Sequence, residues 1–102
     1  MKRIVTAAVI VAAALAGSAH ASDELAKKHN CLACHTMDKK SVGPAYKDVA
    51  KKYKGDAAAA ARLAEKVKQG GQGVWGPVPM PPNSTVPDGD IKTLVDWILK
   101  SA

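Results

Sequence analysis

Apolar and polar residues recur along most of this chain with the period of an amphipathic helix. The pattern predicts four helices, over residues 23–32, 44–54, 56–69 and 88–100. It is clearest in the last of these, where Ile91, Leu94, Val95 and Ile98 recur at helical spacing. The third helix has a stripe of Ala60, Leu63, Ala64 and Val67, and the second has one of Tyr46, Val49, Ala50 and Tyr53. No stretch shows the alternation with a period of two that marks a half-buried strand. The chain is therefore expected to be all-α.

Residues that commonly cap helices set the expected boundaries. Ser22 is a possible N-cap of the first helix, and Pro44 stands at a first-turn position of the second. Gly55 is expected to end the second helix, and Asp56 to cap the third. The third helix should then run to Gln69, before Gly70 and Gly71.

The segment of residues 70–87, called the strap below, holds four glycines and five prolines. A loop of this length inside a compact domain is usually functional or disordered. Val74, Trp75, Val78 and Met80 make it too apolar to be left in solvent. Because proline fixes φ near −65°, we expect a stiff strap with Met80 at its centre.

The first 21 residues have the pattern of a secretory signal peptide. Met1-Lys2-Arg3 precedes an apolar run from Ile4 to Ala16, and Ala19-His20-Ala21 is an Ala-x-Ala cleavage pattern. The run is shorter than the ~20 residues of a membrane-spanning helix. We expect cleavage after Ala21, a periplasmic location and one domain of residues 22–102; an uncleaved membrane anchor is the alternative.

From Ser22 onward, 13 basic residues face 9 acidic ones, a net charge of +4. This charge suits an acidic partner or a membrane surface. Nucleic acid is not expected, since no basic cluster is interleaved with aromatic residues. The chain has no Phe, two Trp and two Tyr, and a domain of this size usually needs a disulfide, a metal or another staple. Another group is therefore expected to fill the core.

Cys31, Cys34 and His35 form a C-x-x-C-H sequence. On a helix their spacing of i, i+3 and i+4 places all three side chains on one face. Two cysteines can bond the vinyl groups of a haem laid there, while the histidine reaches the iron. This sequence is the attachment signal of c-type haem.

Three other uses of these residues compete with haem. A structural zinc site needs four ligands, and His29 is the one further histidine left after cleavage. A thioredoxin-like redox site should lie beside a βαβ pattern. A disulfide between Cys31 and Cys34 would close a very small loop and stabilise little. Haem is favoured over all three.

The expected sixth ligand of the iron is Met80. Met37 follows His35 too closely to reach the opposite face of the haem, whereas the strap can bring Met80 there. Filling a gap in the core is the ordinary alternative for Met80; His29 is expected to be a surface or helix-packing residue. His/Met ligation leaves no open position on the iron and raises its reduction potential. These features indicate an electron carrier and not an enzyme.

Four stretches together resemble the small bacterial class I monohaem cytochromes c of the c-551/c-552 type. They are Cys31-Leu-Ala-Cys-His35, Val42-Gly-Pro-Ala-Tyr46 with the following Lys47-Asp-Val-Ala50, Gly73-Val-Trp-Gly-Pro77 and Pro79-Met-Pro-Pro-Asn83. The resemblance spans nearly all of residues 22–102. It implies a class I cytochrome c fold, with about four helices wrapped around one haem c bound through Cys31 and Cys34.

The resemblance also implies roles for three further residues. The Pro44 carbonyl would accept the ring N–H of the proximal His35, Trp75 would donate to a haem propionate, and Asn83 would contact the region of the methionine ligand. Trp75 could equally fill the core, and Asn83 could be a turn residue. The sequence departs from its relatives at Ala26 and Asn30, where Phe and Gly are common for close packing against the last helix. Trp97 is expected to compensate by covering more area.

Relatives of this type carry electrons between a membrane cytochrome complex and terminal reductases or oxidases, in some cases nitrite reductase. The resemblance implies a monomeric carrier without stable membrane insertion after signal cleavage. Lys27, Lys28, Lys39 and Lys40 are candidates to rim an apolar docking patch at the haem edge. The competing functions are a haem-based ligand sensor or enzyme with a vacated methionine position, and an adaptor that uses Pro79-x-x-Pro82.

Overall fold

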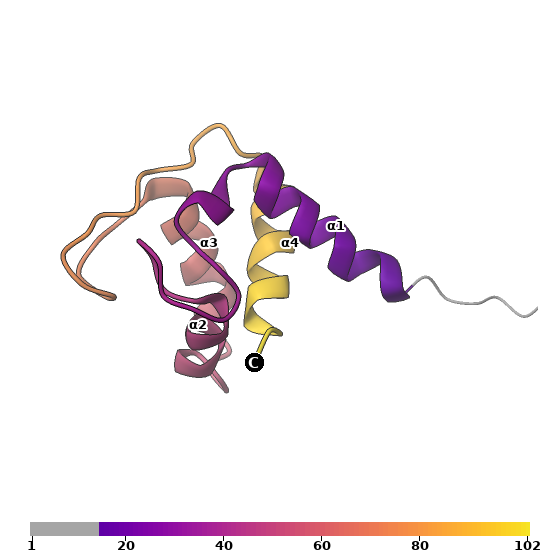
Figure 1. Cartoon of the computed structure of the whole chain (residues 1–102), viewed down its shortest axis with the longest axis horizontal. Helices are drawn as coiled ribbons and strands as arrows, with labels where there is room; N and C mark the ends of the chain where they lie inside the picture. Colours follow the sequence, from indigo (N-terminus) through magenta and orange to yellow (C-terminus); the bar gives the residue numbers. More distant parts are fainter. Residues whose placement is uncertain (1–14) are drawn as a thin grey trace, which may run out of the picture.

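The computed structural model describes residues 15–102, and within them one helix, α4 (Asp88–Leu99), contacts each of the others. The partners of α4 are α1 (Leu15–Lys28), α2 (Tyr46–Lys52) and α3 (Ala59–Gln69). These three helices bring no Cα atoms within 8 Å of one another in the described part of the chain. Figure 1 shows α4 at the centre, with α1 crossing one end of it and the strap looping out from α3. The fold is all-α, as expected, and the helix α4 holds it together.

The apolar stripe predicted for α4 forms the centre of the core. Ile91 and Val95 are both 2% exposed, and they cluster with Val86 from the end of the strap. The predicted stripe of α3, which consists of Ala60, Leu63, Ala64 and Val67, packs against this cluster. Of the ten buried apolar residues in the described part of the chain, four are alanine and one, Tyr46, is aromatic. The protein's own core is therefore small in volume, as its composition predicts.

Two helices begin later than their sequences indicate. The N-cap of α2 is Ala45, with extended backbone, so Pro44 precedes the helix and does not lie in its first turn. The third helix begins at Ala59; Asp56 Oδ1 instead accepts a hydrogen bond from the Ala58 N–H at 3.0 Å in the turn before it. The end of α3 at Gln69 agrees with the prediction, and Gly70 follows with φ of 74°.

The prediction for the first helix was wrong at both ends. α1 begins at Leu15, so Ser22 lies inside it, and α1 ends at Lys28, four residues before Leu32. Asn30 then adopts a left-handed conformation with φ of 60°, which asparagine tolerates better than most residues. A short 3₁₀ helix, η1 (Cys31–Ala33), follows. The left-handed residue breaks the helical direction, and the cysteines therefore lie on a separate turn.

Part of the predicted signal peptide, residues 1–14, lies outside the described residues, and residues 15–21 belong to α1. Cleavage after Ala21 stays a prediction. Among the residues that were described, no helix has the length and apolar character to span a membrane.

A contact between His29 and Asp90 joins the end of α1 to the start of α4. His29 Nε2 lies 3.1 Å from Asp90 Oδ2, and the His29 side chain is 13% exposed. His29 follows α1 and Asp90 is in the first turn of α4. His29 is thus a helix-packing residue, which is one of the two roles expected of it.

The left-handed Asn30 gives a first testable prediction. Asn30→Ala should lower the free energy of unfolding by about 1 kcal/mol, because a Cβ without a polar side chain is strained in this conformation. Asn30→Gly should retain or increase stability, since glycine adopts positive φ freely. Denaturant unfolding of the haem-loaded protein measures both. Equal losses for Ala and Gly would mean that the Asn30 side chain, and not its backbone conformation, matters.

Candidate haem site

The C-x-x-C-H residues lie on one tight turn instead of on a helix face. The Cys31 carbonyl accepts hydrogen bonds from the backbone N–H of Cys34 at 3.2 Å and of His35 at 3.0 Å. Both thiols are free and half-buried. These bonds join residues i+3 and i+4 to residue i, as in one turn of a helix, so the predicted spacing brings the three residues together on this single turn and not on a longer α-helix.

The imidazole of His35 is fixed by the segment before α2. His35 Nδ1 lies 2.8 Å from the Pro44 carbonyl oxygen. Because a carbonyl can only accept, Nδ1 carries the proton and donates it, which leaves the lone pair of Nε2 available for a metal. This is the contact that the resemblance implies for Pro44, and hydrogen bonds of this kind help to orient a ligand and raise its basicity.

The geometry disfavours the competing uses of the cysteines. Within residues 15–102, no group of three or more His, Cys, Asp or Glu side chains is placed to hold a metal ion, as a zinc site would require. Burial raises the pKa of the Cys31 thiol, and a hydrogen bond with Tyr46 opposes this only in part. A redox-active dithiol depends on a lowered thiol pKa. The pKa of the Cys31 thiol is raised instead, so Cys31 does not fit a redox-active dithiol.

The strap is anchored on both sides of Met80. Met80 N–H donates to the Gly71 carbonyl at 2.7 Å, and Gly71 N–H donates to the Met80 carbonyl at 3.0 Å. After Met80, the backbone N–H and the side-chain Nδ2 of Asn83 both donate to the Val67 carbonyl of α3, each at 3.1 Å. Nδ2 also lies 3.3 Å from the Pro81 carbonyl oxygen. Asn83 therefore ties the Met80 segment to α3 and does more than form a turn.

Gly70 allows this close approach of the strap. A Cβ at Gly70 would lie 2.5 Å from the Met80 carbonyl oxygen and 2.8 Å from the Pro82 nitrogen. Its φ of 74° is also in the region that favours glycine. The position of Met80 thus depends on a glycine ten residues before it.

Several apolar side chains on the strap and on the loop before α2 are not buried by the protein itself. The exposed fractions are 39% for Trp75, 49% for Val74, 59% for Val78 and 55% for Val42. Lys52 Nζ lies 5.6 Å from the centre of the Trp75 ring. A flat, largely apolar cofactor with acidic substituents matches such surfaces. Together with two free thiols and an imidazole with free Nε2, they fit a covalently bound haem.

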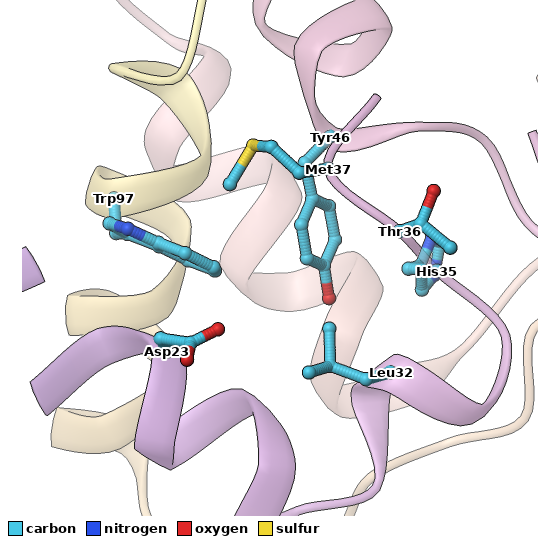
Figure 2. A pocket seen from close by; sticks show the side chains of 7 residues that line it. All are labelled: Asp23, Leu32, His35, Thr36, Met37, Tyr46 and Trp97. Atoms are coloured by element: carbon cyan, nitrogen blue, oxygen red, sulfur yellow. The ribbon is translucent and has the colours of Figure 1, made fainter. Parts of the chain in front are cut away.

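Tyr46, which the sequence predicts only as part of an apolar stripe, lies beside His35. Figure 2 shows Tyr46 between Trp97 and His35, lining a cavity of about 250 Å³ together with Leu32, Thr36, Met37 and Asp23. Burial raises the pKa of the Tyr46 hydroxyl, and the neighbouring Cys31 raises it further. Met37 also lines this cavity, and Figure 2 shows its side chain on the Trp97 side of Tyr46, on a segment separate from the strap. Periodicity alone gave no signal for these contacts.

Two free thiols and an imidazole whose Nε2 is available for a metal lie on one turn of an all-α fold. This combination is typical of electron-transfer proteins that carry a c-type haem. The sequence model of the family Cytochrome c matches residues 18–102. The chain therefore belongs to the cytochrome c family, as a small class I member with a single covalently bound haem c. Members of this kind carry electrons and are not enzymes.

Individual relatives agree with this assignment. The chain is 60% identical over 85 residues to cytochrome c-551 of Allochromatium vinosum, which covers 83% of this chain and 90% of the relative. It is 52% identical over 99 residues to cytochrome c-552 of Hydrogenobacter thermophilus, which covers 97% of each. The crystal structure of cytochrome c552 from Nitrosomonas europaea superposes with a TM-score of 0.76 at 55% identity, over 78% of this chain and 99% of that one. The expected fold class is thereby confirmed.

The strap geometry gives a second prediction. Gly70→Ala should cost about 1–3 kcal/mol more stability than Gly73→Ala, because it also forces the Met80 backbone to move. Gly73→Ala is the matched control, since Gly73 also has positive φ but its Cβ would meet nothing within 4 Å. Unfolding by denaturant measures the cost. Equal costs for the two variants would mean that the crowding at Gly70 is relieved without affecting the strap.

Proposed function

We propose that the protein is a periplasmic one-electron carrier in which Cys31 and Cys34 attach the haem and His35 and Met80 bind its iron. The observation that carries the proposal is the His35–Pro44 hydrogen bond, which commits Nδ1 to a carbonyl and leaves Nε2 for the metal. When bound, the haem supplies one-electron chemistry by alternating between ferric and ferrous iron. The residues of this chain attach it, orient the ligands and exclude exogenous molecules.

Met80 is the proposed ligand on the face opposite His35. The paired bonds with Gly71 and the attachment of Asn83 to α3 hold its backbone on both sides. Since both axial positions are then filled by protein, no site remains for substrate or O₂. Asn83 acts as a positioning residue for Met80 in this proposal.

Trp75 is proposed to donate its indole N–H to a haem propionate. Its exposed fraction of 39% supports this, because a Trp that only filled the core would be buried. The Lys52 ammonium over its ring adds positive charge at the same place, where it would favour a carboxylate.

The test is an absorption spectrum of the purified protein in both redox states. A c-type spectrum that survives acid extraction, with a long-wavelength methionine-to-iron band in the ferric state, is expected. The mass of the same sample should equal a chain that begins at Ser22 plus one haem. A ferric spectrum without the methionine band would contradict the ligand assignment.

Met80→Ala provides the third prediction. The midpoint potential should fall, because the thioether that favours ferrous iron is lost, and CO should bind readily at neutral pH. Potentiometric titration and CO difference spectra measure the two effects. Met37→Ala is the control and should retain the methionine band. An unchanged potential in Met80→Ala would show that Met80 does not bind the iron.

The proposed partners are a membrane cytochrome complex as electron donor and a terminal reductase or oxidase as acceptor, nitrite reductase among them, with this protein acting as a monomer. Six lysines and one acidic residue lie between residues 39 and 54, whereas acidic residues slightly outnumber basic ones in the rest of the chain from Ser22. Lys39, Lys40 and the 55% exposed Val42 lie together on the loop before α2. Lys27 is less suited to docking, since it pairs with Asp23 at 3.1 Å. An apolar residue next to exposed lysines supports docking of an acidic partner on this loop.

The fourth prediction tests this docking loop. Reversing two charges by Lys39→Glu with Lys40→Glu should slow oxidation by the anionic oxidant ferricyanide several-fold at low salt and weaken its salt dependence. Lys92→Glu with Lys100→Glu on and after α4 makes the same change in net charge and serves as the control. Stopped-flow kinetics at several ionic strengths measure both. Equal slowing in the two variants would show that net charge, and not this loop, governs the encounter.

A further inference from the structure

The segment of residues 43–47 is paired with the segment of residues 34–37 by a series of hydrogen bonds. Gly43 N–H donates to the Cys34 carbonyl at 2.7 Å, Tyr46 N–H to the Thr36 carbonyl at 2.9 Å and Lys47 N–H to the Met37 carbonyl at 3.1 Å. The His35–Pro44 bond lies within this series. The backbone around His35 is therefore tied to the start of α2, and Tyr46 is held at a fixed position relative to the imidazole.

Tyr46 stacks on His35. The two ring centroids are 5.1 Å apart, and the ring planes are inclined by 19°. Tyr46 itself is 4% exposed. Its second aromatic contact is with Trp97 of α4, at 5.6 Å between centroids and 70° between planes, which is an edge-to-face arrangement. Figure 2 shows the order of the three rings, with Tyr46 in the middle.

Gly43 also contacts the imidazole. A Cβ at Gly43 would lie 2.5 Å from Cε1, 2.8 Å from Nδ1 and 3.0 Å from Nε2 of His35. The backbone of Gly43 therefore lies against the ring at a distance that only glycine permits. His35 is restrained by Gly43, Pro44 and Tyr46 from one four-residue segment.

We propose that Tyr46 is a positioning residue for the proximal ligand, and that its ring, supported by Trp97, sets the rotation of the His35 imidazole and thereby tunes the reduction potential. The proposal rests on the proposed function, in which His35 binds the iron. The hydrogen bond to Pro44 alone does not fix this rotation, since N–H···O bonds keep most of their strength over tens of degrees of misalignment. The stacked Tyr46 ring, whose centroid is 5.1 Å from that of the His35 ring, narrows the range of imidazole orientations.

Tyr46 also keeps water from the ligand. Removing a buried ring beside His35 would admit solvent, which stabilises the more highly charged ferric state and lowers the potential. The Tyr46 hydroxyl is not needed for either effect, because stacking and exclusion of water depend on the ring.

The experiment compares Tyr46→Leu, Tyr46→Phe and Val49→Ala in the haem-loaded protein. Val49 is buried on the same helix at 8% exposure and makes no stacking contact with His35, so Val49→Ala controls for lost packing. The readouts are the midpoint potential and the pattern of hyperfine-shifted haem methyl resonances of the oxidised protein, which reports the orientation of the imidazole plane. We expect Tyr46→Leu to lower the potential and change the methyl pattern, whereas Tyr46→Phe and Val49→Ala should retain both.

An unchanged methyl pattern and potential in Tyr46→Leu would overturn the proposal, as would equal changes in Val49→Ala, because lost packing alone would then explain them. If Tyr46→Leu does not fold, Trp97→Leu removes the supporting ring instead, and an unchanged pattern in that variant overturns the proposal. A wild-type protein without the low-spin spectrum of His/Met ligation would contradict the proposed function first, and the role of Tyr46 with it. The two failures are therefore distinguishable.

Discussion

The hydrogen bond between His35 Nδ1 and the Pro44 carbonyl is the constraint on which the site depends. It joins the turn that carries the two cysteines to the segment that starts α2, and it determines which imidazole nitrogen stays free. Three backbone hydrogen bonds between residues 34–37 and 43–47 support it. Because α2 packs on α4, the orientation of one side chain is linked to the centre of the fold.

The arrangement of the helices explains why a protein with so small a core can hold this site. α1, α2 and α3 are joined through α4, and four of the ten buried apolar residues are alanines. Meanwhile Val42, Val74, Val78 and Trp75 keep apolar surface exposed on the loop before α2 and on the strap. In the proposed function, a haem held by Cys31 and Cys34 would cover part of that surface, and burying a valine side chain fully is worth roughly 1.5–3 kcal/mol. Cofactor binding and folding are therefore expected to be coupled.

Local periodicity predicted the parts of the fold that depend on local sequence, such as the stripes of α3 and α4 and the end of α3 at Gly70. It missed the end of α1, because the left-handed Asn30 is a single residue whose polar side chain looks ordinary in a helical pattern. The ligand candidates were predictable because C-x-x-C-H and the proline-framed Met80 are chemical signals in themselves. Tyr46 was predicted as a buried residue but not as a neighbour of His35, since that contact arises from the pairing of two loop segments. Gly43 was missed for the same reason.

The groups that contact the His35 ring, which are the Pro44 carbonyl, Gly43 and Tyr46, are neutral, and this matters for the potential. A carboxylate as partner of Nδ1 would give the imidazole more anionic character and stabilise ferric iron, whereas the Pro44 carbonyl does so less. A thioether such as that of Met80 favours ferrous iron. The buried Tyr46 ring beside His35 disfavours the more highly charged state for a third reason, because it excludes water. All three features act in the same direction, and each is held by backbone hydrogen bonds that need not change when an electron is gained. In the proposed carrier, a high potential and a small structural change on reduction would therefore have the same origin.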